Sequence, residues 1–154
     1  MIWEEMEDAM IFVGLEAEQD TEVLDILGNA MIRAGYGRAA YVDALLERER
    51  DFPTGLDIQG IGVAIPHTDA CHVKKEGIAF ASMKKPVPFY LMGEEDVQIP
   101  VSLIFMLAMQ GTDTHLKRLQ GILDIIQDTK TLEQLLQARE QKEIIQIIKE
   151  KESA

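Results

Sequence analysis

The largely apolar run at residues 101–109 constrains the fold of this chain more than any other segment. Its nine residues include no charged residue, no glycine and no proline. Such a run is typical of a central strand that is buried on both faces of a sheet. A strand of this kind needs cover on both sides, so the run predicts a sheet that lies between layers of helices.

Helical patterns occur before and after the middle of the chain. Asp20, the expected N-cap, opens an amphipathic pattern that predicts a helix ending near Gly35. A second helix is expected at about 38–50, before the helix-breaking segment 52–55. After Gly111 the apolar spacing is helical again. The first apolar stripe of this region consists of Leu116, Leu119, Ile122, Leu123 and Ile126.

Short apolar runs between these helical regions are typical of strands. The runs, separated by turn-forming or charged residues, lie at 10–15, 62–65, 77–83 and 87–92. Together with the central run they predict an α/β fold, a mixed sheet of about five strands with helices on both sides. We expect a single domain over residues 1–154.

The composition favours a soluble globular protein that does not bind nucleic acid. Apolar residues make up 47% of the chain and charged residues 27%, as in ordinary soluble domains. The 27 acidic and 15 basic residues give a net charge of −12, which repels phosphate backbones. This acidity suits a partner with a basic face, or it serves solubility alone.

The cytoplasm is the expected location. The N-terminal residues are acidic and lack the basic region of a signal peptide. The apolar run around 99–109 is too short to cross a bilayer, so no membrane insertion is expected. Cys71 is the single cysteine; it excludes an internal disulfide and fits a reducing compartment.

Two histidines follow predicted strands. His67 ends the segment Gly-Ile-Gly-Val-Ala-Ile-Pro-His, in which the glycines permit a turn or a close backbone approach and Pro66 restricts the chain. His115 follows the central run at the start of a predicted helix, with Thr112 or Asp113 as N-cap. The carboxyl ends of parallel strands line the crevice where ligands bind. Both imidazoles are therefore expected at one edge of the sheet.

Phosphoryl transfer is the chemistry that suits this arrangement. An imidazole nitrogen is a nucleophile near neutral pH, since its unperturbed pKa is about 6.5. The reaction needs positioning and charge stabilisation more than covalent help. A helix N-terminus beside His115 would offer N–H groups to phosphate oxygens and keep that imidazole neutral. From these patterns alone, His67 as a solvent-facing loop residue remains the alternative.

Three segments, in order along nearly the whole chain, carry a family resemblance. They are Leu-Glu-Arg-Glu at 46–49 with Pro-Thr-Gly at 53–55, the motif that ends at His67, and the run at 103–108 followed by His115. Together they resemble the enzyme IIA domains of the fructose–mannitol class of the bacterial sugar phosphotransferase system. The motif that ends at His67 is similar to the phosphorylation motif of that family.

The resemblance implies a phosphocarrier without metal or organic cofactor. His67 would accept a phosphoryl group from the phosphohistidine of the carrier protein HPr and pass it to a cysteine of a cognate enzyme IIB. The sugar would enter through the membrane enzyme IIC. By the same resemblance His115 supports the active histidine and Arg48 lies near the site, where a guanidinium can hold phosphate oxygens. A solvated helix face would give the same residues around Arg48.

The residues around the motif look more like galactitol-type enzyme IIA than mannitol-type. This likeness rests on the segment 52–56 and on His72. Mannitol and fructose versions continue Pro-His-Gly, whereas Thr68 and Asp69 follow His67 here. Thr68 offers a hydroxyl and an N–H, while Asp69 opposes a phosphate unless it points away or caps a turn.

Two alternatives from other classes stay open. One is a regulatory module that is phosphorylated by the same system but controls a partner protein. The other is a small hydrolase that uses His67, His72 and Cys71. The glycine pattern before His67 lacks the third glycine and the following helix of a dinucleotide fingerprint, and no further ligand cluster favours zinc.

Overall fold

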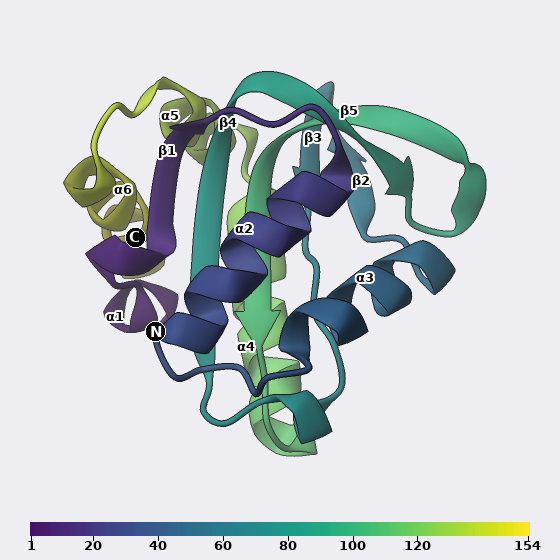
Figure 1. Ribbon diagram of the computed structural model, residues 1–154. Helices are drawn as coiled ribbons and strands as arrows, with labels where there is room; N and C mark the ends of the chain where they lie inside the picture. Colours follow the sequence, from purple (N-terminus) through teal and green to yellow (C-terminus); the bar gives the residue numbers. More distant parts are fainter.

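The central sheet has the predicted size and is mixed. The computed structural model describes residues 1–94, 96–111 and 116–154. Five strands form the sheet in the order β1-β4-β2-β3-β5, with β4 and β5 also paired to each other (Figure 1). The strand bounds are β1 Ile11–Leu15, β2 Gly55–Ile58, β3 Ile61–Ala64, β4 Gly77–Leu91 and β5 Glu94–Ala108.

Helices cover both faces of this sheet, as expected for α/β packing. In Figure 1, α2 and α3 cross one face, while α4, α5 and α6 lie on the other side. The helix bounds are α1 Ile2–Glu5, α2 Asp20–Arg33, α3 Tyr41–Asp51, α4 Thr112–Ile126, α5 Thr129–Gln137 and α6 Gln141–Ser153. Short 3-10 helices are η1 Asp8–Met10 and η2 Ala70–His72. The fold class predicted from the sequence is confirmed.

Alternate residues in the second half of β5 enter two separate cores, which explains the apolar sequence of that half. Ile104 and Met106 pack with α2 and α3, whereas Leu103, Phe105 and Leu107 pack with the C-terminal helices. Phe105 also meets Phe80 of β4 edge to face, with ring centroids 5.1 Å apart. The strand is therefore buried on both faces, as its composition predicts.

Several predicted boundaries are wrong. The runs at 77–83 and 87–92 form one strand, β4, because an irregular register between Ser82 and Val87 lets the strand bend without ending. Strand β2 and helix α1 were not predicted. Helix α3 begins at Tyr41 rather than near residue 38.

The helix caps and one apolar stripe also differ from the sequence-based expectations. Gln19 rather than Asp20 is the N-cap of α2, and Gly111, with φ +75°, occupies the N-cap position of α4 in place of Thr112 or Asp113. Leu116, assigned to the buried stripe of α4, is 67% exposed. Periodicity shows which residues share a face, but not how far that face is covered.

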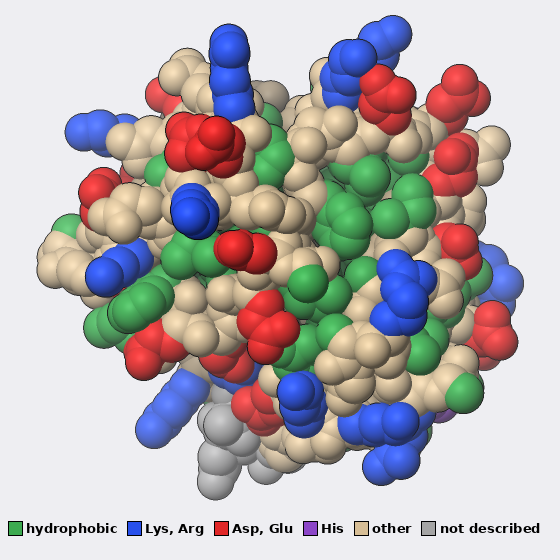
Figure 2. Space-filling view, turned by 60° about the vertical axis from the view of Figure 1, so that its left-hand side comes forward, with side chains coloured by type: hydrophobic (Ala, Val, Ile, Leu, Met, Phe, Trp, Pro, Cys, Tyr) green, Lys and Arg blue, Asp and Glu red, His purple; other side chains and the backbone are tan. Residues whose placement is uncertain are grey.

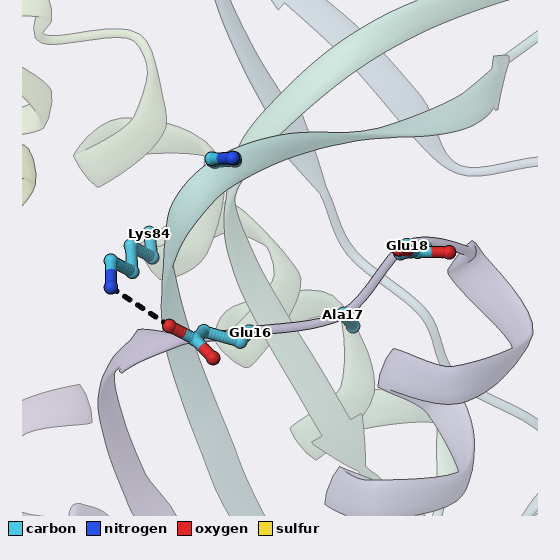
Figure 3. Close-up of a pocket in the computed structure, with 5 residues that line it drawn as sticks. Glu16, Ala17, Glu18 and Lys84 are labelled. Atoms are coloured by element: carbon cyan, nitrogen blue, oxygen red, sulfur yellow. Dashed lines mark hydrogen bonds and ion pairs between the residues drawn. The ribbon is translucent and has the colours of Figure 1, made fainter.

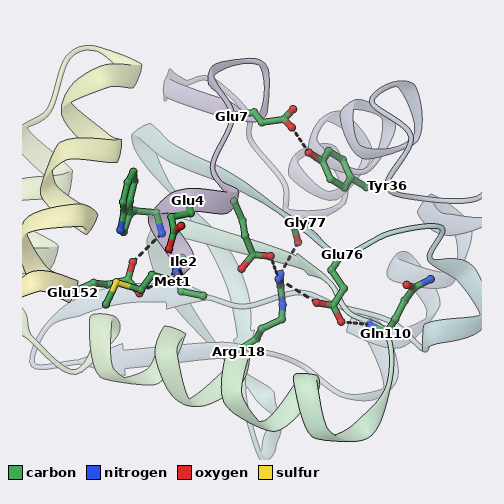
Figure 4. Close-up of polar contacts among 12 residues, drawn as sticks. Met1, Ile2, Glu4, Glu7, Tyr36, Glu76, Gly77, Gln110, Arg118 and Glu152 are labelled. Atoms are coloured by element: carbon green, nitrogen blue, oxygen red, sulfur yellow. Dashed lines mark hydrogen bonds and ion pairs between the residues drawn. The ribbon is translucent and has the colours of Figure 1, made fainter.

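The ends of the chain are joined by a side-chain clamp. Glu152 of α6 accepts hydrogen bonds from the backbone N–H groups of Ile2 and Trp3, at 2.9 and 2.8 Å (Figure 4). The carboxylate thereby satisfies two of the orphan N–H groups at the start of α1. This contact holds the first residues against the C-terminal helix.

Charges of both signs are spread over the surface in Figure 2. Acidic and basic side chains are interspersed on that face, with apolar side chains between them. A mixed surface produces a weaker long-range field than a patch of one sign. On this face the net charge of −12 therefore forms no single acidic patch.

Candidate functional site

The pairing of β3 with β5 places His67 at the edge of the sheet. These strands run parallel, with Val63 opposite Leu103. Beyond the end of β3, His67 forms a further parallel bridge with Leu107, and the Leu107 N–H donates to the Pro66 carbonyl at 3.0 Å. The backbone before His67 is thus fixed against the central strand, while the side chain is half-buried.

Hydrogen bonding selects the tautomer of His67. Its Nδ1 lies 2.9 Å from the carbonyl oxygen of Ile65. A carbonyl only accepts, so Nδ1 carries the proton in this bond. In the neutral ring the lone pair then resides on Nε2. The contact orients the imidazole and makes Nε2 its nucleophilic atom.

The loop after His67 is anchored to the segment between α2 and α3. Thr68 is buried. The carbonyl of His72 accepts from the N–H of Arg38 at 2.9 Å, and Lys74 N–H donates to the Tyr36 carbonyl at 2.8 Å. These bonds hold the end of the loop, at residues 72–74, against the segment that contains Tyr36 and Arg38. His72 is half-buried and Cys71 is exposed.

Arg48 meets this loop across a small surface hollow. Its Nη1 lies 3.5 Å from Asp69 Oδ1, and its guanidinium carbon is 4.7 Å from the centroid of the exposed Phe52 ring. The hollow is lined by Ala44, Glu47, Arg48, Asp51, Phe52, Thr68, Asp69 and His72. The structure thus brings Arg48 to a residue two positions after His67, although the two segments are distant in sequence.

A buried carboxyl next to Arg48 was missed by the sequence analysis. Glu49 is 5% exposed, and its two oxygens accept from the Thr54 N–H and hydroxyl, both at 2.8 Å. These bonds tie the last turn of α3 to the residue before β2. Burial raises the pKa of Glu49 to about 7, against the hydrogen bonds from Thr54 that lower it. In the sequence, Glu49 is indistinguishable from its solvated neighbours.

We expect the raised pKa of Glu49 to make stability depend on pH. Between the ordinary value of 4.5 and about 7, the folded chain holds the proton and the unfolded chain does not. The free energy of unfolding therefore falls as pH rises through this window and levels off above it. Relative to Glu49→Gln, wild type should lose up to about 3 kcal/mol between pH 4 and 8.

Urea unfolding of both proteins across this pH range measures the difference. Glu47→Gln is the matched control, because Glu47 is exposed on the same helix turn. Its free energy of unfolding should follow the wild-type pH curve. A constant difference between wild type and Glu49→Gln at all pH values would contradict the assignment.

A buried arginine holds the first part of α4 against the sheet. Arg118 contacts Glu5, Glu76 and the backbone of Gly77, and Figure 4 shows it beside the last two. It forms ion pairs with both glutamates, at 3.6 Å to Glu76 Oε2, and Nη2 donates to the Gly77 carbonyl at 3.1 Å. Glu76 also accepts from the N–H of Gln110 at 3.3 Å. This network ties α4 and the end of β5 to the start of β4, and no pattern in the sequence predicts it.

His115 lies outside the described residues. The bounds of α4 place its position in the first turn of that helix, and β5, which precedes it, ends at the same edge of the sheet as β3. The predicted contact of its side chain with His67 stays a prediction.

A second hollow lies at the opposite end of the sheet. Figure 3 shows it beside the end of β1, where Lys84 Nζ donates to Glu16 Oε1 at 2.9 Å. This hydrogen bond lowers the pKa of Glu16. Both side chains are exposed, and exposed pairs of this kind contribute little. We therefore place the candidate site at the His67 end.

Neither a metal cluster nor a membrane helix is found in the described part of the chain. No group of three or more His, Cys, Asp or Glu side chains among those residues is placed to hold a metal ion. Among the same residues, no helix has the length and hydropathy needed to cross a membrane.

Comparison with known proteins first defines the fold class. The structure resembles enzyme IIAMTL from Escherichia coli, solved in complex with phosphorylated enzyme IIBMTL, with a TM-score of 0.78. The likeness covers 94% of this chain and 97% of that one at 23% sequence identity. The mixed sheet with helices on both sides is therefore an enzyme IIA fold.

The sequence then identifies the family. Residues 6–151 match the model described as "Phosphoenolpyruvate-dependent sugar phosphotransferase system, EIIA 2", and the chain belongs to this family. Members act as phosphotransferases through a phosphohistidine intermediate. The chain is thus a phosphocarrier, as the resemblance in its motifs implies, and the hydrolase alternative has no support.

Two curated relatives indicate the range of roles in this family. The galactitol-specific EIIA component of Escherichia coli K12 is 29% identical over 131 residues, which cover 85% of this chain and 87% of that protein. The transcriptional regulator ManR of Bacillus subtilis is 32% identical over 128 residues, 82% of this chain but 18% of the regulator.

Proposed function

We propose that His67 is the phosphorylated residue of this phosphocarrier. The observation that carries the proposal is the bond between Nδ1 and the Ile65 carbonyl, which leaves Nε2 as the nucleophile. Nε2 attacks the phosphorus of a phosphohistidine on HPr, so one P–N bond forms while the donor's P–N bond breaks. The ring then bears both Nδ1–H and the phosphoryl group and is positively charged. The Ile65 carbonyl stabilises that charge.

The onward step reverses this chemistry. A cysteine thiolate of enzyme IIB attacks the phosphorus, so a P–S bond forms while the P–Nε2 bond breaks. The electron pair returns to Nε2, and His67 is again a neutral imidazole with its proton on Nδ1. Arg48 holds phosphoryl oxygens during both transfers, since a guanidinium neutralises phosphate charge as it shifts. No metal or organic cofactor takes part. HPr and enzyme IIB are the direct partners, and enzyme IIC takes part only through enzyme IIB.

Galactitol is the proposed sugar, and the cytoplasm the proposed location. The galactitol-specific relative and the galactitol-type residues around the motif support this choice. HPr and the soluble face of the transporter meet the carrier on the same side of the membrane. Transport of a different sugar with the cognate enzymes IIB and IIC would overturn the choice of sugar and leave the carrier role intact.

Reconstitution tests the carrier role. The protein is incubated with phosphoenolpyruvate, enzyme I and HPr, and the bound phosphate should be stable in base and labile in acid, as a phosphohistidine is. Adding enzyme IIB should then discharge the label onto its cysteine. Omitting HPr is the control and should prevent uptake. Uptake without HPr, or a label that survives acid, would refute the proposed relay.

Replacing His115 should separate the two half-reactions. We propose that His115 donates a hydrogen bond to the phosphoryl group from the first turn of α4. His115→Ala should therefore still accept label from phospho-HPr but pass it to enzyme IIB about 100-fold more slowly, the lower end of the effect of losing one positioned donor. Rapid-quench measurement of both steps tests this. Normal discharge by the variant would remove His115 from the site.

A regulatory role is the second candidate. It is favoured by the match to one segment of the regulator ManR. In this role the phosphorylated domain changes the activity of a partner protein rather than supplying an enzyme IIB. Phosphorylation by HPr would then proceed normally, but label would not pass to enzyme IIB of the galactitol system. The discharge step in the reconstitution distinguishes the two roles.

A further inference from the structure

The carboxylate of Asp69 pairs with the guanidinium of Arg48, the group that we propose binds the phosphoryl oxygens. Asp69, two residues after His67, has its Oδ1 3.5 Å from Arg48 Nη1. It stands at the N-cap position of η2, yet its side chain makes no capping hydrogen bond there. The carboxylate therefore faces Arg48 instead of stabilising the turn.

The position of Arg48 is fixed largely without Asp69. Its guanidinium lies over the ring of Phe52 at 4.7 Å, and Glu49 ties the end of α3 to Thr54. The ion pair itself is solvent-accessible, with side-chain exposures of 37% for Arg48 and 73% for Asp69. Exposed pairs are weak, so a stronger anion can displace the carboxylate while the guanidinium stays in place.

A phosphoryl group is such an anion. It carries a charge of about −1.5 to −2 and three strong acceptor oxygens. Guanidinium binds phosphate through two parallel hydrogen bonds that are stronger than neutral ones. Phosphate on His67 therefore competes with Asp69 for the same donors.

We propose that Asp69 is an internal anion that holds Arg48 while His67 is unphosphorylated and yields it to the phosphoryl group. This inference rests on the proposed function of His67. Asp69 is a positioning residue, since it acts through Arg48. It keeps the guanidinium of Arg48 paired while His67 is unphosphorylated. Because this pair must break first, the net free energy that Arg48 contributes to binding the phosphoryl group is smaller. The phosphorylated form is thereby kept unstable enough to pass the group on.

The equilibrium between phospho-HPr and the phosphorylated protein measures this competition. Asp69→Asn should shift it toward the phosphorylated protein by about threefold to fivefold, the worth of one exposed pair. Asp69→Glu should restore the wild-type ratio. Asp51→Asn is the matched control: Asp51 lines the same hollow but pairs with Arg50, at 3.6 Å. It should change the ratio less than about 1.5-fold.

A double-mutant cycle separates competition for Arg48 from simple charge repulsion. In an Arg48→Gln background, Asp69→Asn should shift the equilibrium less than half as much as in the wild-type background. An equal shift in both backgrounds, or equal shifts from Asp69→Asn and Asp51→Asn, would overturn the inference. If wild type accepts no label from phospho-HPr, the proposed function itself fails. Circular dichroism of each variant confirms that the proteins compared are folded.

Discussion

Replacing His67 by alanine should reduce uptake of label from phospho-HPr to the level seen without the protein. The reason is chemical: we propose that Nε2 of His67 attacks phosphorus, and the variant has no nitrogen at that position. Loss of a hydrogen-bond partner or of a phosphate ligand slows the reaction, whereas loss of the nucleophile abolishes it. The measurement is the amount of acid-labile phosphate per chain at completion, rather than the initial rate.

The fold should survive this substitution. The contacts that bind this segment to β5 are backbone contacts, the bridge to Leu107 and the bond from Leu107 N–H to Pro66. Alanine keeps both. His72→Ala is the matched control, because His72 lines the adjacent hollow and is also half-buried. It should reach the wild-type amount of phosphate, and label on His67→Ala with none on His72→Ala would reassign the phosphorylated residue.

The parts of the fold that the sequence predicted are those that depend on local pattern. The run at 101–109 predicted a strand buried on both faces because each face of β5 is covered by a separate core. The sequence pattern predicts a break between two strands at residues 84–86, which are Lys84, Lys85 and Pro86. In the structure these residues are exposed at a bulge within one strand, and a sequence does not distinguish a bulge from a turn.

In the candidate site, too, local sequence predicts some residues, whereas contacts between distant segments are seen only in the structure. His67 was predicted because the motif before it is continuous in the sequence. The contact of Arg48 with Asp69 and that of Glu49 with Thr54 were not predicted. The first depends on α3 lying beside the loop that follows His67, which local sequence does not indicate. The alternating charges at residues 47–50 are typical of a solvated helix face. Glu49, the third of these residues, is nevertheless buried and hydrogen-bonded to Thr54. Only the folded structure, in which Glu49 reaches Thr54 just before β2, reveals that difference.

Replacing Gly62 by alanine should be among the most disruptive single changes in the chain. A Cβ at this position would lie 1.8 Å from the carbonyl oxygen of Pro100 and 2.9 Å from the Cα of Val101. These are backbone atoms of β5 and cannot rotate away, so β3 must move off the central strand. We expect a loss of about 3 kcal/mol or more in the free energy of unfolding, at the upper end for overpacking.

Gly60→Ala provides the contrast that tests this reasoning. Gly60 has φ +93° and no atom near its would-be Cβ, so alanine there meets backbone strain alone, at a cost of about 1–2 kcal/mol. Urea unfolding of both variants gives the comparison, and label uptake by the folded fraction gives the functional consequence. Because β3 sets the position of His67 beside Leu107, the folded Gly62→Ala protein should also be phosphorylated more slowly than Gly60→Ala. Equal stability of the two variants would show that β3 does not need its close approach to β5, and that the site depends on the loop after His67 instead.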